Sequence, residues 1–183
     1  MSCIVKTIVR SVIIIITLCL LAACGGGSGS NSSSSTPTPT PDPTPTPIQQ
    51  TTAALTLSAT GATSVALAGV GVTIILPTGV TPKLNSSGEV DSSVVQVSGA
   101  AVPGTSLAAY LPATTTDKGK LTLAVASSSQ TGFTGGDYAL VTLQIARGTT
   151  VSQSDFTLTG FSAIATSGAT VTGYTPGFGA TIQ

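Results

Sequence analysis

The side chains that could carry chemistry are few in this chain, and their positions exclude most catalytic arrangements. There is no histidine, and the three cysteines are Cys3, Cys19 and Cys24, all within the first 24 of 183 residues. A histidine or cysteine base–nucleophile pair therefore cannot be built in the remainder of the chain. The same distribution excludes a disulfide framework or a cysteine-ligated metal there. We therefore expect a protein that is not an enzyme.

Carboxylates are the next candidates for chemistry. Glu89 and Asp91 are two residues apart and share one side of the chain if it is extended, but they lie in "NSSGEVDSS", which is typical of an exposed loop. Because Ca²⁺ prefers oxygen ligands, this pair is a candidate for a structural calcium site of low affinity, with solvated loop charges as the alternative. Asp137 and Asp155 each open a strand-like run, where we expect them to accept hydrogen bonds from backbone amides at turns, with calcium ligation as the alternative. No other cofactor is expected.

Tyr110, Tyr138 and Tyr174 are the candidates for stacking against a ligand, because the chain contains no tryptophan. A tyrosine ring buries a large apolar area and carries a polar hydroxyl at one end. Tyrosines in a planar row would form a platform for a sugar. The alternative is that these three scattered residues are half-buried packing residues.

The first 24 residues have the composition of an export signal. Lys6 and Arg10 precede the apolar run "SVIIIITLCLLAA", residues 11–23, which is too short for a comfortable membrane span. The run ends in Leu21-Ala22-Ala23-Cys24, which is a branched apolar residue, two small residues and a cysteine. An ordinary signal peptide and an uncleaved membrane anchor are the alternatives to a processed leader.

The tetrapeptide at 21–24 resembles the lipobox of bacterial lipoproteins. The resemblance implies that signal peptidase recognises Leu21, Ala22 and Ala23, cleaves after residue 23, and leaves Cys24 acylated with chains such as palmitate. Several acyl chains anchor a protein stably, since each buried methylene contributes about 0.8 kcal/mol. Gly25 rather than aspartate follows the cysteine, which is similar to lipoproteins sent to the outer membrane. We expect an exported protein anchored there, facing the periplasm or the outside.

Residues 24–50 are predicted to be a linker. "GGGSGSNSSSS", residues 25–35, is typical of flexible coil, whereas "TPTPTPDPTPTP", residues 36–47, has proline at every second position. Proline fixes its own φ and favours polyproline II at about 3.1 Å per residue, so the second part would span roughly 35 Å. This composition predicts a stiff spacer; a docking ligand or a glycosylated stalk are the alternatives.

Residues 51–183 are predicted to form one β-sandwich domain. Short runs alternate apolar and polar residues and are separated by Gly, Pro, Asn, Ser and Asp, and no run has a helical period with caps. The expected strands lie near residues 54–60, 70–77, 94–99, 106–112, 120–126, 137–148, 155–164, 169–174 and 177–183. Eight or nine strands without helices favour two packed sheets, with a closed barrel as the alternative. We expect Val, Leu, Ile and Ala to fill the core, with Phe133, Phe156, Phe161 and Phe178 as the large residues.

The order of turns and strands resembles cohesin-like modules and their carbohydrate-binding-module relatives over residues 54–172. The matching features are a "P-x-G-V" turn, a "G-x-L" strand and two acidic–aromatic steps, at Pro77–Val80, Gly119–Leu121, Gly136–Tyr138 and Ser154–Phe156. The resemblance implies a jelly-roll sandwich of about nine strands. The chain departs from these modules in its low content of charged and aromatic residues, at 7% and 4%. No dockerin-contact residue can be transferred, so a dockerin partner does not follow.

Charge narrows the range of partners. Past Cys24 the chain has four basic and six acidic residues, and no basic stripe exists to neutralise phosphates, so no nucleic-acid partner is expected. We expect a lipid-anchored, non-catalytic binding or assembly module of the cell envelope that contacts the membrane through its lipid and recognises a protein partner. A carbohydrate-binding module of the same fold, with a polysaccharide as its ligand, is the alternative.

Overall fold

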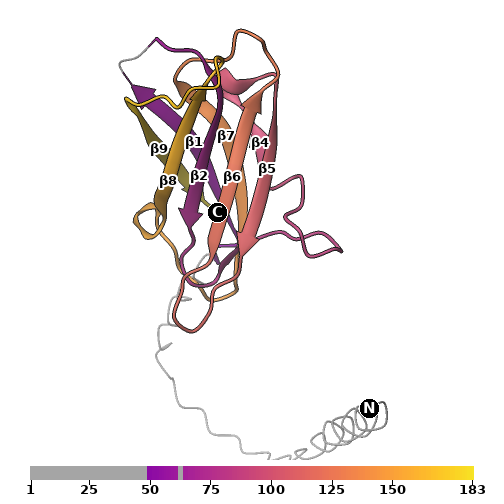
Figure 1. The fold of residues 1–183 in the computed structure, drawn as a ribbon. Coiled ribbons are helices and arrows are strands. Elements are labelled where there is room, and N and C mark those ends of the chain that lie inside the picture. The colour runs from indigo at the N-terminus through magenta and orange to yellow at the C-terminus, as the bar shows by residue number, and fades with distance from the viewer. Residues whose placement is uncertain (1–48, 62–63) are drawn as a thin grey trace, which may run out of the picture. The chain divides into compact units, whose positions relative to one another are not determined.

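The computed structural model describes residues 49–61 and 64–183 (Figure 1). The predictions for the leader at 1–23, for lipidation of Cys24 and for nearly all of the linker lie outside the described residues. Helix in the described part is limited to two three-residue 3₁₀ turns, η1 (Gly99–Ala101) and η2 (Gln153–Asp155). Neither is long or apolar enough to cross a membrane.

The described chain forms nine strands, which confirms the predicted all-β fold. They are β1 (Thr52–Gly61), β2 (Leu67–Ile75), β3 (Val80–Pro82), β4 (Val95–Val97), β5 (Gly104–Leu111), β6 (Lys120–Ser127), β7 (Gly136–Ile145), β8 (Thr157–Ala165) and β9 (Tyr174–Ile182). One sheet has the order β3-β7-β1-β9, with β4 also paired to β7, and the other has the order β5-β6-β2-β8. All pairings are antiparallel. The two sheets lie face to face (Figure 1), so the fold is a sandwich rather than a closed barrel.

The core lies between the sheets and is filled by the alternate residues that the sequence pattern predicts. Leu55, Leu57 and Ala59 of β1 are completely buried, as are Val141 and Leu143 of β7. The facing sheet contributes inward residues from β2 and β6, namely Val70, Val72, Ile74, Leu121, Leu123 and Val125. Burying one such side chain contributes about 1.5–3 kcal/mol, so this set supplies most of the favourable free energy of folding.

Aromatic packing differs in part from the prediction. Phe133 and Phe156 are buried, whereas Phe161 and Phe178 are half-buried at the margin of the core. The rings of Phe156 and Phe178 meet edge to face, with centroids 6.4 Å apart, a geometry that the ring quadrupoles favour. The largest fully buried side chain is that of Tyr138, which was expected to be only half-buried.

The predicted and observed strand boundaries differ where the elements are short. The turn at Pro77–Val80 is confirmed, because the Val80 N–H donates to the Pro77 carbonyl at 3.1 Å and Gly79 adopts a φ of +79°. Strand β3 follows it directly and was not predicted, since three residues are too few to show alternation. The two expected closing runs, at 169–174 and 177–183, instead give the single strand β9.

Leu143→Ala should lower the free energy of unfolding by about 2–5 kcal/mol, because it leaves a cavity in the core beneath β7. Its neighbour Thr142 is exposed on the opposite side of the same strand. Thr142→Ala should therefore lower the free energy of unfolding by about 1 kcal/mol or less. Chemical denaturation of the two variants measures both values, and equal losses would contradict the assigned sides of β7.

Candidate functional site: the edge of strand β5

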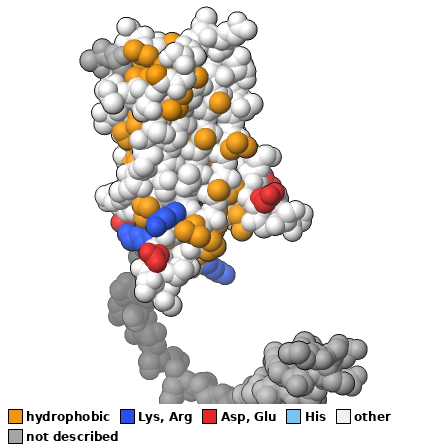
Figure 2. All heavy atoms as spheres, viewed as in Figure 1, with side chains coloured by type: hydrophobic (Ala, Val, Ile, Leu, Met, Phe, Trp, Pro, Cys, Tyr) orange, Lys and Arg blue, Asp and Glu red, His pale blue; other side chains and the backbone are white. Residues whose placement is uncertain are grey.

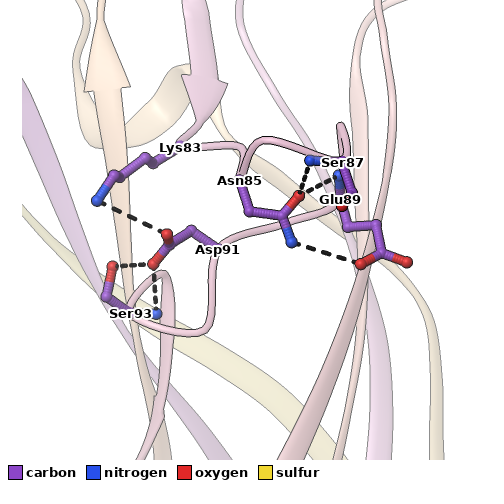
Figure 3. A network of polar contacts seen from close by, with 6 residues as sticks. All are labelled: Lys83, Asn85, Ser87, Glu89, Asp91 and Ser93. Carbon is purple, nitrogen blue, oxygen red and sulfur yellow. Dashed lines mark hydrogen bonds and ion pairs between the residues drawn. The ribbon is translucent and has the colours of Figure 1, made fainter.

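The predicted carboxylate pair lies on the exposed segment between β3 and β4, as expected for a loop (Figure 3). The side-chain oxygen of Asn85 accepts hydrogen bonds from the N–H groups of Ser87, at 2.9 Å, and Glu89, at 3.0 Å. The Asn85 amide in turn donates to the Glu89 carboxylate at 3.4 Å. Asn85 therefore forms the turn and also holds the Glu89 side chain.

Asp91 belongs to a separate set of contacts. Its carboxylate accepts hydrogen bonds from the Ser93 N–H, at 2.9 Å, and the Ser93 hydroxyl, at 2.6 Å, and it lies 3.7 Å from the Lys83 ammonium. The bonds from Ser93, with a smaller contribution from Lys83, hold the pKa of Asp91 below its usual range. Figure 3 shows the carboxylates of Glu89 and Asp91 pointing in different directions.

These contacts do not assemble a cation site. In the described part of the chain no three His, Cys, Asp or Glu side chains lie together as a metal-binding group. A calcium ion takes six to eight oxygen ligands, and the pair Glu89 and Asp91 is not supplemented by a third carboxylate. We therefore do not propose a metal site here.

The predictions for the two other aspartates, Asp155 and Asp137, have different outcomes. The Asp155 carboxylate accepts hydrogen bonds from the Ser152 N–H, at 2.7 Å, and the Ser152 hydroxyl, at 2.8 Å, which completes a capping box at η2 and lowers the pKa of Asp155. Its predicted role at a turn is confirmed. The same prediction for Asp137 is wrong, since within the described residues its exposed carboxylate accepts no hydrogen bond.

Tyr110, Tyr138 and Tyr174 do not form a planar platform, so the prediction that the three tyrosines together stack on a sugar is wrong. Tyr138 has no exposed surface, and Tyr174 is 8% exposed, with its hydroxyl donating to the Val65 carbonyl at 3.0 Å. Only Tyr110, on β5, is partly exposed. A sugar ring needs an accessible aromatic face, so neither Tyr138 nor Tyr174 can stack on one in this structure.

Tyr138 instead carries a buried hydroxyl with no hydrogen-bond partner in the described part of the chain. Burial raises the pKa of Tyr138, because the phenolate would lose its hydration inside the core. Leaving a buried donor unpaired costs about 1–3 kcal/mol. This hydroxyl is therefore a local weakness of the core and not a reactive group.

Among the described residues, the two large apolar side chains with the highest exposed fractions lie on β5. Leu107 is 78% exposed and Leu111 is 61% exposed, and both project outward with Ala109 between them. Because a strand rises about 3.3 Å per residue, these residues form an apolar stripe roughly 13 Å long. Their neighbours on β6 are Ala124, opposite Leu107, and Thr122, opposite Ala109.

The outer face that carries this stripe is almost free of charge. Its outward residues on β6 are Thr122, Ala124 and Ala126, and Lys120 stands at the start of that strand. Figure 2 shows charged side chains gathered at the lower end of the view and at one side, with most of the face apolar or polar and uncharged. A partner would therefore meet a surface with few charges to desolvate.

Strand β5 also has unpaired backbone groups along one edge. The Ser128 N–H donates to the Pro103 carbonyl at 2.9 Å, so residue 103 faces β6 in the register that pairs Gly104 with Ser127. Hydrogen-bonded pairs alternate along an antiparallel ladder. The N–H and C=O groups of Ser106, Ala108 and Tyr110 therefore point away from β6, towards the edge of the sheet.

This edge borders a groove of about 550 Å³. One wall is the β5 segment from Ser106 to Tyr110, and the other is the loop segment from Gly88 to Ser92. The Ser106 hydroxyl donates to the Val95 carbonyl at 3.0 Å, which connects β5 to β4 across the two sheets. The groove therefore lies beside a backbone edge whose position is fixed by both sheets.

Comparison of the chain with protein-family models, with curated proteins and with solved structures finds no match. Sequence reasoning predicted a strand at 106–112 but missed Leu107 and Leu111 as surface residues. In "SLAAYLP" apolar residues occupy both sides of the strand, so alternation gives no signal for which side faces the solvent.

Tyr138→Phe should keep or increase the free energy of unfolding, by up to about 1 kcal/mol, because it removes an unpaired buried hydroxyl. Chemical denaturation at neutral pH measures this change.

The raised pKa of Tyr138 also makes the free energy of unfolding depend on pH. The unfolded chain ionises Tyr138 near pH 10, whereas the folded chain keeps it protonated, so its contribution to stability is complete below about pH 10 and falls as the pH rises further. Denaturation from pH 8 to 11 measures this loss, which should be smaller in Tyr138→Phe. An equal loss in both proteins would contradict the assignment.

Amide hydrogen exchange tests the unpaired edge of β5. Ser106, Ala108 and Tyr110 should exchange rapidly, because their N–H groups face the groove, and Leu107, Ala109 and Leu111 should be protected by β6. Residue-resolved exchange by NMR measures this alternation. Uniform protection along β5 would contradict the edge assignment.

Proposed function

We propose that this protein is a lipid-anchored, non-catalytic binding or assembly module of the cell envelope, and that it recognises a protein partner through β5. The observation that carries the proposal is the exposed stripe of Leu107, Ala109 and Leu111 beside an edge with unpaired backbone groups. Contiguous exposed apolar surface commonly marks an interaction site. Backbone groups of a sheet edge are matched by another extended polypeptide chain, which favours a protein over a sugar as ligand.

The anchoring part of the proposal rests on the sequence from Leu21 to Cys24 and on the linker that follows. A lipid on Cys24 would hold the chain at the membrane, and the Thr-Pro spacer would hold the sandwich away from the lipid surface. The residue inventory supports a non-catalytic role, because the chain has no histidine and its described carboxylates form no cluster of three.

The carbohydrate-binding alternative has less support. Tyr138 and Tyr174 are buried, and only Tyr110 among the three tyrosines offers part of a ring to a ligand. No particular observation favours this function, so it serves as the competing outcome of the binding experiment below.

Replacement of the proposed acylation site should release the protein from membranes. In Cys24→Ala the chain should carry no acyl group and fractionate as a soluble protein, because it would lose the acyl chains that hold it at the membrane. Cys19→Ala, inside the predicted leader, is the matched control and should stay with the membrane. Metabolic labelling with palmitate and membrane fractionation measure both properties. A Cys24→Ala protein that still partitions with lipid would overturn the anchor.

Partner capture tests recognition. The full-length protein should retain a specific protein from the producing cell's own envelope and secretome, and Leu107→Ser combined with Leu111→Ser should abolish retention. Ile164→Ser, which alters an exposed apolar residue on β8, is the control and should retain the partner. Soluble glycans should not compete. Competition by a polysaccharide, with no protein retained, would favour the carbohydrate-binding alternative.

A further inference from the structure

A sandwich of two open sheets has four edges, and three of them are blocked in this structure. An open edge exposes unpaired N–H and C=O groups that can pair with another chain, and proteins commonly cover such edges, shorten them, bend them with bulges or place proline there.

The outer edge of β9 is closed by proline and by a glutamine. Thr52 and Gln183 exchange hydrogen bonds of 3.0 and 2.9 Å, so the even-numbered residues of β9 face away from β1. Pro176 therefore has no N–H to present at this edge. The Gln153 side chain donates to the Phe178 carbonyl at 3.2 Å and accepts from the Ala180 N–H at 3.3 Å.

The edges formed by β8 and by β3 with β4 are also blocked. Strand β8 has a register irregularity against β2 and a glycine, Gly160, with a φ of +59°, and such a bulge bends an edge away from a new partner. Its end is covered by residues 169–171, which bond back to Ala163 and Ala165. Strands β3 and β4 have only three residues each, and β3 ends at Pro82.

Strand β5 has none of these devices. Its eight residues, Gly104–Leu111, contain no proline and no charge, and its register with β6 is continuous. Its outward side chains include Leu107 and Leu111, which are apolar. Among the described strands, β5 is therefore the one long edge without protection.

We propose that the edge of β5 binds an extended segment of the partner protein by strand addition. The N–H and C=O groups of Ser106, Ala108 and Tyr110 would pair with its backbone, and Leu107 and Leu111 would pack beside its outward side chains. This inference rests on the proposed function, because it specifies how the protein partner is recognised.

The groove favours a single strand over a second copy of the sandwich. The segment between β3 and β4 projects sideways past β5 (Figure 1), and its residues from Gly88 to Ser92 form the far wall of the groove. Neighbouring strands lie about 4.8 Å apart, so one strand can pair with β5 beside this wall. A second sandwich would bring its own second sheet into the position that the wall occupies.

The wall also specifies the charge of the occupant. The residues that line the groove include Glu89 and Asp91 but no lysine or arginine. Asp91 is paired with Lys83, whereas the Glu89 carboxylate accepts only a hydrogen bond from the Asn85 amide within the described residues. The bound segment should therefore carry Lys or Arg on the side that faces the loop and apolar residues on the side next to Leu107 and Leu111. Proline should be absent where its N–H would pair with β5.

Selection from a library of random short peptides against the full-length protein in detergent tests the proposal. Selected peptides should alternate apolar residues with Lys or Arg, and their binding to the wild type should protect the amides of Ser106, Ala108 and Tyr110 from exchange. Ala108→Pro removes an edge N–H and leaves the ladder to β6 intact, so it should weaken binding by about tenfold or more. Should Ala108→Pro fail to fold, Ser106→Pro is the second variant, and it is compared with Ser106→Ala because both lose the hydroxyl bond to the Val95 carbonyl.

A charge variant provides the matched control. Glu89→Gln should weaken binding of a Lys-bearing peptide by about twofold to fivefold and leave its Lys→Thr counterpart unchanged. The absence of any selected peptide, binding that survives both proline variants, or unchanged exchange of the β5 amides would overturn the proposal. Dimers in sedimentation velocity that protect the same amides would also overturn it, because the occupant would then be a second copy.

The outcome separates this inference from the proposed function. If the protein partner is still captured by Ala108→Pro, the proposed function stands and the edge is not its site. If peptides bind the edge but no partner protein is captured, strand addition is supported and the proposed function fails.

Discussion

Interleaving of aliphatic side chains between the two sheets is the interaction on which the rest of the structure depends. Leu55 and Leu57 of β1 meet the inward residues of β2 and β6, and the charged content of 7% leaves few ion pairs to contribute. One ion pair between described residues, Lys83 with Asp91, lies in an exposed loop, and such pairs contribute little to stability. Because apolar packing between the sheets supplies the stability, the outer faces need no stabilising ion pairs and can consist of small, uncharged residues.

Two open sheets impose a second constraint, since each edge leaves backbone groups unpaired. The chain satisfies these groups at β9 with the Gln153 side chain and Pro176, and it shortens or bends the edges at β3, β4 and β8. Each of these features prevents pairing at one particular edge. The edge of β5 lacks them, and the same strand carries the two most exposed leucines of the described chain, so β5 is the edge best suited to bind another chain.

The fold was predictable from the sequence to a useful degree because strand alternation has a period of two residues. That period assigned Leu121, Leu123 and Val125 to the core and Thr122 and Ala124 to the surface, as the structure shows. The prediction was poorer where the period carries no information. Strand β3 is three residues long, and Tyr138 was placed at half burial because its amphipathic ring is compatible with either environment. The candidate site was missed, since apolar residues occupy both sides of β5.

The sequence by itself determined the all-β class, the inward residues of β1, β2, β6 and β7, and the scarcity of side chains that could carry chemistry, because each follows from residue type and local spacing. It also supplies the lipobox-like tetrapeptide ending at Cys24 and the Thr-Pro spacer, on which the proposed anchoring depends. Only the tertiary structure decided which strands lie at the edges and which are paired on both sides. It alone placed the Gly88–Ser92 segment opposite Ser106–Tyr110 and separated the carboxylates of Glu89 and Asp91 into different contacts. The physical reason is that sheet order and loop placement depend on contacts between residues distant in sequence, which no local pattern records.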